Sequence, residues 1–179
     1  GFVSDDVAWN CNYPNYECVF ATDSFEWSRA YYRGVQDVKG AVRYLVNRQQ
    51  LFSIDTNNVF LAGESAGSFI AMGVGLMDDE SERPFGTNAI ADAPVPNANA
   101  LGCSYNVNET FSGPVARPDL GAISGSIEPS TVDYTIKGIG NFYGAMMGDL
   151  LQLSDPSKPK PAIYSFHRPC DMIVPIGSK

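Results

Sequence analysis

The stretch VFLAGESAGSFIAM, residues 59–72, places Ser65 between two glycines, Gly63 and Gly67. The apolar residues before Ser65 predict a buried parallel strand, and the small and apolar residues after it predict a helix. A serine at a sharp strand-to-helix turn projects its hydroxyl from the carboxyl edge of a sheet, where the backbone N–H of the next residue, Ala66, can bind a developing oxyanion. Because such a turn is crowded, we expect side chains to be excluded at positions 63 and 67. The alternative is a glycine-rich turn with an idle serine.

A nucleophilic serine needs a base and an acid that orients the base. Asp171 is the candidate acid, because it follows the apolar run AIYSF (162–166) within one loop. Asp133 and Asp149 are poorer candidates, since neither comes directly after a convincing strand. The alternative for Asp171 is a carboxylate in a solvated turn.

The chain contains a single histidine, His167, directly after the same apolar run. A histidine at the end of a strand is expected to order its own loop rather than reach between the serine and the acid. Around this kind of turn the chain order is serine, acid and then histidine. We therefore expect the base to lie beyond Lys179.

Periodic apolar residues predict the elements that position these groups. Asp23 and Glu26 have the spacing of a capping box, and an apolar stripe after them predicts a helix that ends near Arg48. The stripe comprises Tyr31, Val35, Val38, Val42 and Leu45, and the opposite polar face carries Arg29, Arg33, Asp37 and Arg43. Strands are predicted over 59–62, 134–144 and 161–166, and a second helix over 68–77.

This order of helices and strands predicts an α/β fold with parallel strands. We expect the whole chain, 1–179, to form part of a single domain. Residues 78–133 are rich in Pro, Gly, Asn and Ser and show no sustained period. Because that is long for a structureless connection, we expect an irregular excursion or lid-like region that shapes a pocket.

Composition narrows the possible partners and compartments. The 179 residues carry a net charge of −8, which argues against a nucleic-acid partner, and no apolar stretch is long enough to span a membrane. Cys11 and Cys18 bracket a short loop and suit a local disulfide, although four cysteines allow three pairings. With the glycosylation sequon at 108–110, the cysteines favour an exported protein. The alternative is four buried thiols in a cytosolic enzyme.

Longer stretches resemble the α/β-hydrolase superfamily, and within it carboxylesterases of the hormone-sensitive-lipase and acetyl-xylan-esterase types. Residues 31–72, YYRGVQDVKGAVRYLVNRQQLFSIDTNNVFLAGESAGSFIAM, are similar to the family's helix–loop–strand–elbow block. Residues 163–176, IYSFHRPCDMIVPI, look like the block around the acid, where the upstream histidine is not the base. Here HRPCD replaces the usual HGT.D. Gly1 and Phe2 look like the tail of the family's HGGGF oxyanion loop.

The resemblance implies an α/β-hydrolase fold, a mostly parallel sheet with helices on both faces. We expect this chain to hold part of it, without the N-terminal strands and the segment of the catalytic histidine. The implied chemistry is ester hydrolysis through a Ser-His-Asp triad and an acyl-enzyme, with Ser65 and Asp171 in the triad and Ala66 and Gly1 in the oxyanion hole. The substrate is expected to be a small-molecule or carbohydrate-linked ester. Neither a metal nor a cofactor is expected. The sequence as a whole is most similar to exported bacterial members of the family.

Two other functions fit the same fold. One is a non-catalytic surface or binding protein that keeps the elbow as a relic, since fold does not decide function. The other is a peptidase, which would use the same triad and differ in its pocket. Intact Gly63, Ser65, Gly67 and Asp171 favour the esterase, because a relic has no reason to keep all four.

Overall fold

The computed structural model describes residues 24–93, 115–147, 156–169, 171 and 174. Gly1, Asp149, the sequon at 108–110 and the four cysteines lie outside the described residues. The predicted disulfide, the oxyanion role of Gly1 and the export of the protein therefore stay predictions. The lid-like role of 78–133 also stays a prediction.

The predicted elements around Ser65 are present with close to the expected bounds. Helix α1 spans Ser24–Asn47, strand β1 spans Val59–Glu64 and helix α3 spans Ala66–Leu76. The two later predicted strands are β4, Ile136–Phe142, and β5, Ala162–Phe166. Shorter elements complete the described chain: α2 (Gln49–Phe52), the 3-10 helix η2 (Glu80–Glu82), β2 (Ile90–Ala93) and β3 (Val115–Arg117).

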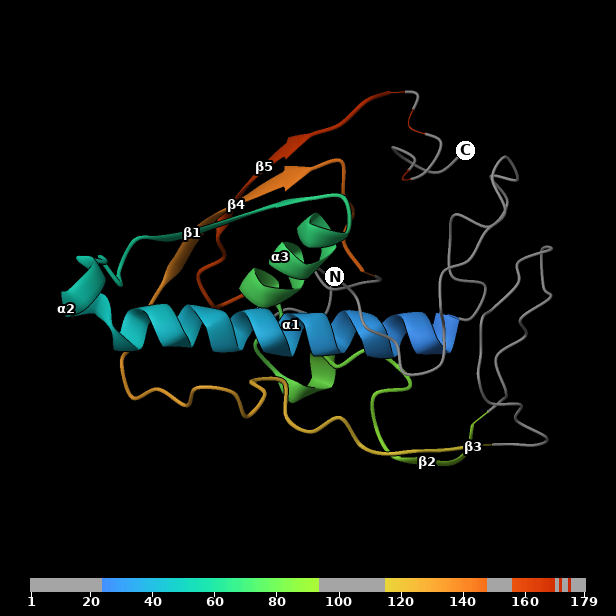
Figure 1. Ribbon diagram of the computed structural model, residues 1–179. Helices are drawn as coiled ribbons and strands as arrows, with labels where there is room; N and C mark the ends of the chain where they lie inside the picture. Colours follow the sequence, from blue (N-terminus) through green and yellow to red (C-terminus); the bar gives the residue numbers. More distant parts are fainter. Residues whose placement is uncertain (1–23, 94–114, 148–155, 170, 172–173, 175–179) are drawn as a thin grey trace.

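The main sheet has the order β1-β4-β5, and all three strands are parallel, as the sequence predicted. Its register aligns Glu64 with Phe142 and Phe142 with Phe166, so the three carboxyl ends meet at one edge. Helix α3 packs on β1 and β4, and α1 packs on α3 (Figure 1). This arrangement is that of an α/β-hydrolase-like fold in part.

The core lies between α1, α3 and the covered face of the sheet. Tyr31 and Val35 of α1 and Ile139 of β4 are fully or almost fully buried there. Leu45 was predicted to continue the apolar stripe, but it is 46% exposed. Val46 takes the buried place instead, because the helical period of 3.6 residues carries the stripe from Val42 to Val46.

Within the described residues, α1 and α3 lie on the same side of the sheet (Figure 1). Strand β1 is therefore half-buried rather than buried on both faces, and the prediction was wrong in this respect. Its even-numbered residues face away from α3, and Phe60 is 69% exposed. A Cβ at Gly138 would lie only 2.9 Å from the Phe60 ring, so the ring rests directly on the backbone of β4.

The side of α1 opposite α3 carries a row of side chains that donate hydrogen bonds to backbone carbonyls of the excursion. Arg29 donates to Gly86 and Pro118 at 2.7 and 2.8 Å, and Arg43 donates to Ile127 and Glu128 at 2.6 to 3.1 Å. The other donors to this segment are Tyr32, Gln36 and Asn47. These five side chains, here called the donor row, recur at helical spacing.

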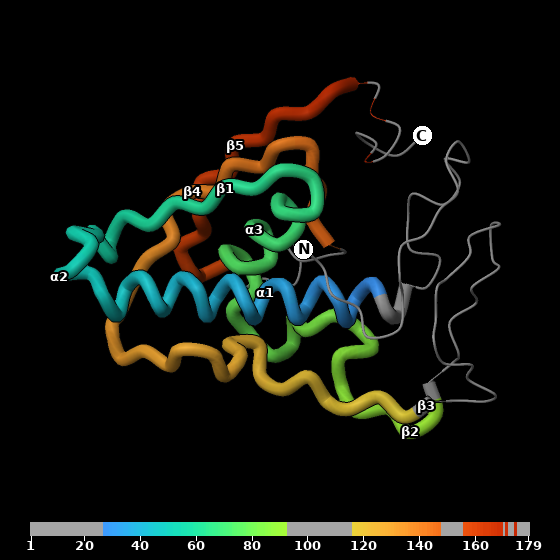
Figure 2. Tube along the Cα trace, viewed as in Figure 1, coloured from blue at the N-terminus to red at the C-terminus, as the bar shows by residue number. Residues whose placement is uncertain are grey.

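Arg29 and Arg43 were predicted on the polar face of the helix, and the structure shows that this face is covered rather than open to solvent. Arg29 is fully buried and Arg43 almost so, because residues 115–133 run along α1 and cover them (Figure 2). An irregular segment leaves many carbonyls without ladder partners, and those carbonyls need donors when they are buried. Arginine supplies several N–H groups from one side chain, which explains why it tolerates burial here.

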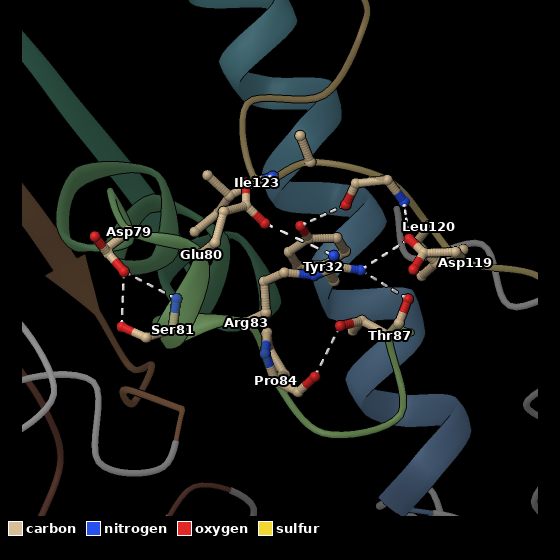
Figure 3. A network of polar contacts seen from close by, with 12 residues as sticks. Tyr32, Asp79, Glu80, Ser81, Arg83, Pro84, Thr87, Asp119, Leu120 and Ile123 are labelled. Atoms are coloured by element: carbon tan, nitrogen blue, oxygen red, sulfur yellow. Dashed lines mark hydrogen bonds and ion pairs between the residues drawn. The ribbon is translucent and has the colours of Figure 1, made fainter. Parts of the chain in front are cut away.

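A polar network around η2 and Arg83 also contacts residues 119–123 of this segment (Figure 3). Arg83 donates to the carbonyl of Thr87 and to Asp119 Oδ1, both at 3.0 Å, and its guanidinium lies over the Tyr32 ring. The N–H of Gly121 and then Arg83 hydrogen-bond the Asp119 carboxylate and lower its pKa. The described part of 78–133 is thus held by specific polar contacts to α1 and η2.

Arg43→Ala should lower the free energy of unfolding by about 2–4 kcal/mol, because two part-buried carbonyls would lose their donor. Arg48→Ala is the matched control: its guanidinium is half-exposed, pairs with Glu128 at 3.5 Å and should be worth at most about 1 kcal/mol. Urea denaturation of both variants measures the difference. Equal losses would show that the donor row does not hold the excursion.

Lys39 is a buried cation of α1 whose side chain reaches the end of α3. Its Nζ donates to the carbonyl of Met77 at 2.5 Å, directly after the last residue of the helix. Burial lowers the pKa of Lys39 to about 8, although nearby Asp78 opposes the shift. Above that pH the folded protein releases a proton that the unfolded chain keeps up to about pH 10.4. Stability from this group therefore rises with pH above about 8.

The free energy of unfolding of the wild type should rise relative to that of Lys39→Met between about pH 8 and about pH 10. Buried Tyr31 and Tyr32 act in the opposite direction only above about pH 10, because burial raises their pKa values, that of Tyr32 to about 12. Both tyrosines are common to the two proteins, so they cancel in the comparison. Parallel pH profiles would contradict the assignment to Lys39.

Candidate active site

Ser65 occupies the turn between β1 and α3, as the sequence predicted. Its backbone has φ 52° and ψ −120°, in a region that residues other than glycine rarely adopt, and the residue is exposed. The N–H of Ser65 donates to the carbonyl of Phe142 at 2.8 Å, and the Ser65 carbonyl accepts from the N–H of Ser68 at 2.9 Å. These two bonds hold the strained turn against β4 and the first turn of α3.

The N-terminus of α3 points its first amides at this turn. Ala66 is the first residue of the helix, and the first N–H groups of a helix have no acceptor within it. The helix dipole adds partial positive charge at the same place. The Ala66 N–H therefore lies where a helix can stabilise negative charge, and its role in an oxyanion hole stays a prediction.

The two glycines of the turn are required for different reasons. A Cβ at Gly63 would lie 2.2 Å from the carbonyl carbon and oxygen of Gly67, so strand and helix backbones meet there without room for a side chain. A Cβ at Gly67 would meet no heavy atom within 4 Å. The prediction of steric exclusion was therefore right for Gly63 and wrong for Gly67, because the α-carbon of Gly67 is on the exposed side of the first helical turn.

Ser68 fixes the turn to the sheet, a role that no motif in the sequence predicted. The residue is fully buried, and its Oγ accepts from the Phe142 N–H at 2.9 Å. The same Oγ contacts the carbonyls of Phe142 and Gly63. A serine within an apolar helix is the only signal that could have revealed it. Gly144 packs against it, since a Cβ there would lie 2.1 Å from Ser68 Cβ.

Asp171 lies in a tight loop after β5. Its Oδ1 accepts from the N–H of Val174 at 2.9 Å, and its own N–H donates to the carbonyl of Arg168 at 3.2 Å. His167 Nε2 lies 2.6 Å from the Val174 carbonyl oxygen and 3.4 Å from Asp171 Oδ2. Because a carbonyl only accepts, Nε2 carries a proton. His167 thus orders its own loop, as predicted.

The sheet brings the Ser65 turn and the Asp171 loop to the same edge. Ser65 follows the end of β1, and His167 follows the end of β5, with β4 between them. Two strand spacings of about 4.8 Å place the two strand ends roughly 10 Å apart. Asp133, in contrast, precedes β4 and is exposed near the amino end of that strand. Asp133 is therefore not at the edge that carries Ser65.

The described part of the chain contains no group of three or more His, Cys, Asp or Glu residues that could hold a metal ion. Its helices are also too short or too polar to cross a membrane.

The fold, with the Ser65 turn and the Asp171 loop at the same edge of the sheet, defines the class of the protein as α/β-hydrolase-like. The family model BD-FAE matches residues 21–112, just over half of the chain, including α1, β1 and the Ser65 turn. The chain belongs to the BD-FAE family, a family of α/β-hydrolase-like esterases. Asp171 lies outside the matched residues. No curated protein and no solved structure matches the chain significantly.

Gly63→Ala should destabilise the fold by about 3 kcal/mol, because backbone atoms of α3 cannot move away from the new methyl group. Gly67→Ala should be neutral or stabilise by up to about 1 kcal/mol, since alanine favours helix and the site is open. Thermal and urea unfolding of the two variants give the comparison. Similar losses at both positions would mean that strand and helix do not approach as closely as described here.

Proposed function

We propose that the protein is a serine carboxylesterase in which Ser65 is the nucleophile and Asp171 the acid of a Ser-His-Asp triad. The observation that carries the proposal is the exposed Ser65 with positive φ at the N-terminus of α3. The position of Asp171 in the loop after β5, at the same sheet edge, supports it. Membership of the BD-FAE family supports an esterase-like activity in general.

In the proposed reaction, the Ser65 hydroxyl attacks the ester carbonyl and passes its proton to a histidine base. The tetrahedral oxyanion accepts a hydrogen bond from the Ala66 N–H, and we assign a second donor to the Gly1 segment by resemblance. The histidine protonates the leaving alcohol, which leaves an acyl-enzyme on Ser65. Water then attacks the acyl carbon with the same histidine as base, the bond from that carbon to Ser65 Oγ breaks, and the histidine returns the proton to Ser65 as the carboxylic acid leaves.

The base in this proposal is a histidine outside the 179 residues. His167 is an unsuitable base, because its Nε2–H is directed at the Val174 carbonyl and its loop holds it beside the acid. The Asp171 carboxylate is oriented by its own loop, since Oδ1 accepts from the Val174 N–H and Oδ2 lies 3.4 Å from His167 Nε2. We propose a small-molecule or carbohydrate-linked ester as substrate.

The test uses the protein expressed from its complete reading frame and, separately, the 179 residues. The complete protein should hydrolyse p-nitrophenyl acetate, and Ser65→Ala should lower kcat by at least about 10³-fold. Ser124→Ala, at an exposed serine of the excursion, is the matched control and should be active. The 179 residues should show only residual turnover, because the base is missing.

Two results would contradict specific parts of the proposal. Turnover by the 179 residues that is lost in His167→Ala would make His167 the base. A complete protein that is inert to esters of every chain length, and whose Ser65 is not labelled by a fluorophosphonate, would favour the binding-protein function instead. Cleavage of peptides with no ester turnover would favour a peptidase.

A further inference from the structure

The end of β4 lies between the two halves of the proposed site. Phe142 accepts the N–H of Ser65, and Gly144 packs against Ser68 on the nucleophile side. On the other side, the N–H of Tyr143 donates to the carbonyl of Phe166 at 2.9 Å, next to the acid loop. Residue 143 therefore stands between the Ser65 turn and the loop of Asp171.

Tyr143 adopts a backbone conformation that is costly for a bulky residue, with φ 57°. The neighbouring contacts enforce this conformation. Buried Asn141 accepts the Gly144 N–H on its Oδ1 at 3.1 Å, while its Nδ2 donates to Ser165 Oγ at 3.1 Å. Asn or Gly would occupy position 143 with less strain. A strained aromatic residue held this firmly at the sheet edge that carries Ser65 indicates a role for its side chain.

The Tyr143 ring is half-buried and lies against the residues that end β5. It meets the Phe166 ring edge-on, with centroids 5.5 Å apart, and the His167 ring with centroids 6.3 Å apart. His167 in turn contacts the Asp171 carboxylate. The three rings form an aromatic cluster at the carboxyl ends of β4 and β5. Because β4 is next to β1 in the sheet, Tyr143 is one strand away from Ser65. Aromatic rings of this kind provide large apolar contact area with little side-chain freedom to lose.

We propose that Tyr143 is a specificity-determining residue, whose ring forms the wall that receives the apolar part of an ester bound at Ser65. The proposal rests on the esterase function proposed above. Nothing in it requires the phenol hydroxyl, so Tyr143→Phe should behave as the wild type. Removal of the ring should change which esters are preferred rather than whether Ser65 reacts.

The experiment measures kcat/KM of the complete protein for p-nitrophenyl esters from acetyl through octanoyl. The informative variant is Tyr143→Asn, because asparagine tolerates positive φ and leaves the turn intact. Its ratio of octanoyl to acetyl kcat/KM should change by on the order of tenfold, with acetyl turnover within about threefold of the wild type. Tyr44→Asn makes the same change at an exposed position of α1 and should leave the ratio unaltered.

Each outcome separates this inference from the function on which it rests. If the wild type is active and Tyr143→Asn lowers kcat/KM equally for all esters, Tyr143 has only a structural role and the inference is wrong. An unchanged profile would also overturn it. If the wild type is inert and Ser65 resists fluorophosphonate, the esterase function fails, and the inference fails with it.

Discussion

The close approach of β1 and α3 at Gly63 is the constraint on which the rest of the edge depends. Because the backbones meet without a side chain between them, the chain must reverse within one residue, and Ser65 is forced into positive φ with its side chain exposed. Ser68 then fixes this turn against the sheet, since its buried hydroxyl hydrogen-bonds the backbone at the end of β4. The position of the nucleophile relative to the sheet is thus set by backbone contact and one hydroxyl, rather than by the packing of large side chains.

A second set of interactions determines how the irregular excursion is held. Carbonyls in such a segment need donors, and the donor row of α1 provides them from Arg29 at one end to Asn47 at the other. The same helix buries its apolar stripe against α3, so α1 joins the core on one side to the excursion on the other (Figure 2). The buried positive charges of Arg29 and Arg43 are tolerated because each guanidinium group donates hydrogen bonds to two carbonyls.

Backbone strain occurs at the edge where the chemistry is proposed, as well as at Ser53 and Glu128 elsewhere in the described residues. Two of the residues other than glycine with positive φ, Ser65 and Tyr143, follow adjacent strands at the same edge of the sheet. Each donates its N–H to a carbonyl of the neighbouring strand, and such fixation by surrounding structure is the condition under which strain persists. An edge built in this way is consistent with membership of a family of α/β-hydrolase-like esterases. The loop of Asp171 lies at the same edge of the sheet.

The sequence by itself determined the elements and the strained serine. The period of the apolar residues predicted α1, β1, α3, β4 and β5, and the Gly-x-Ser-x-Gly pattern between a strand and a helix predicted Ser65 at the turn, because these signals are local. Only the tertiary structure decided which polar residues are buried, since Arg29 and Arg43 are covered by a segment far away in the chain. It also decided the roles of Ser68 and Tyr143. Their functions arise from contacts with β4 and β5, and no periodicity in the sequence encodes a contact between distant strands and loops.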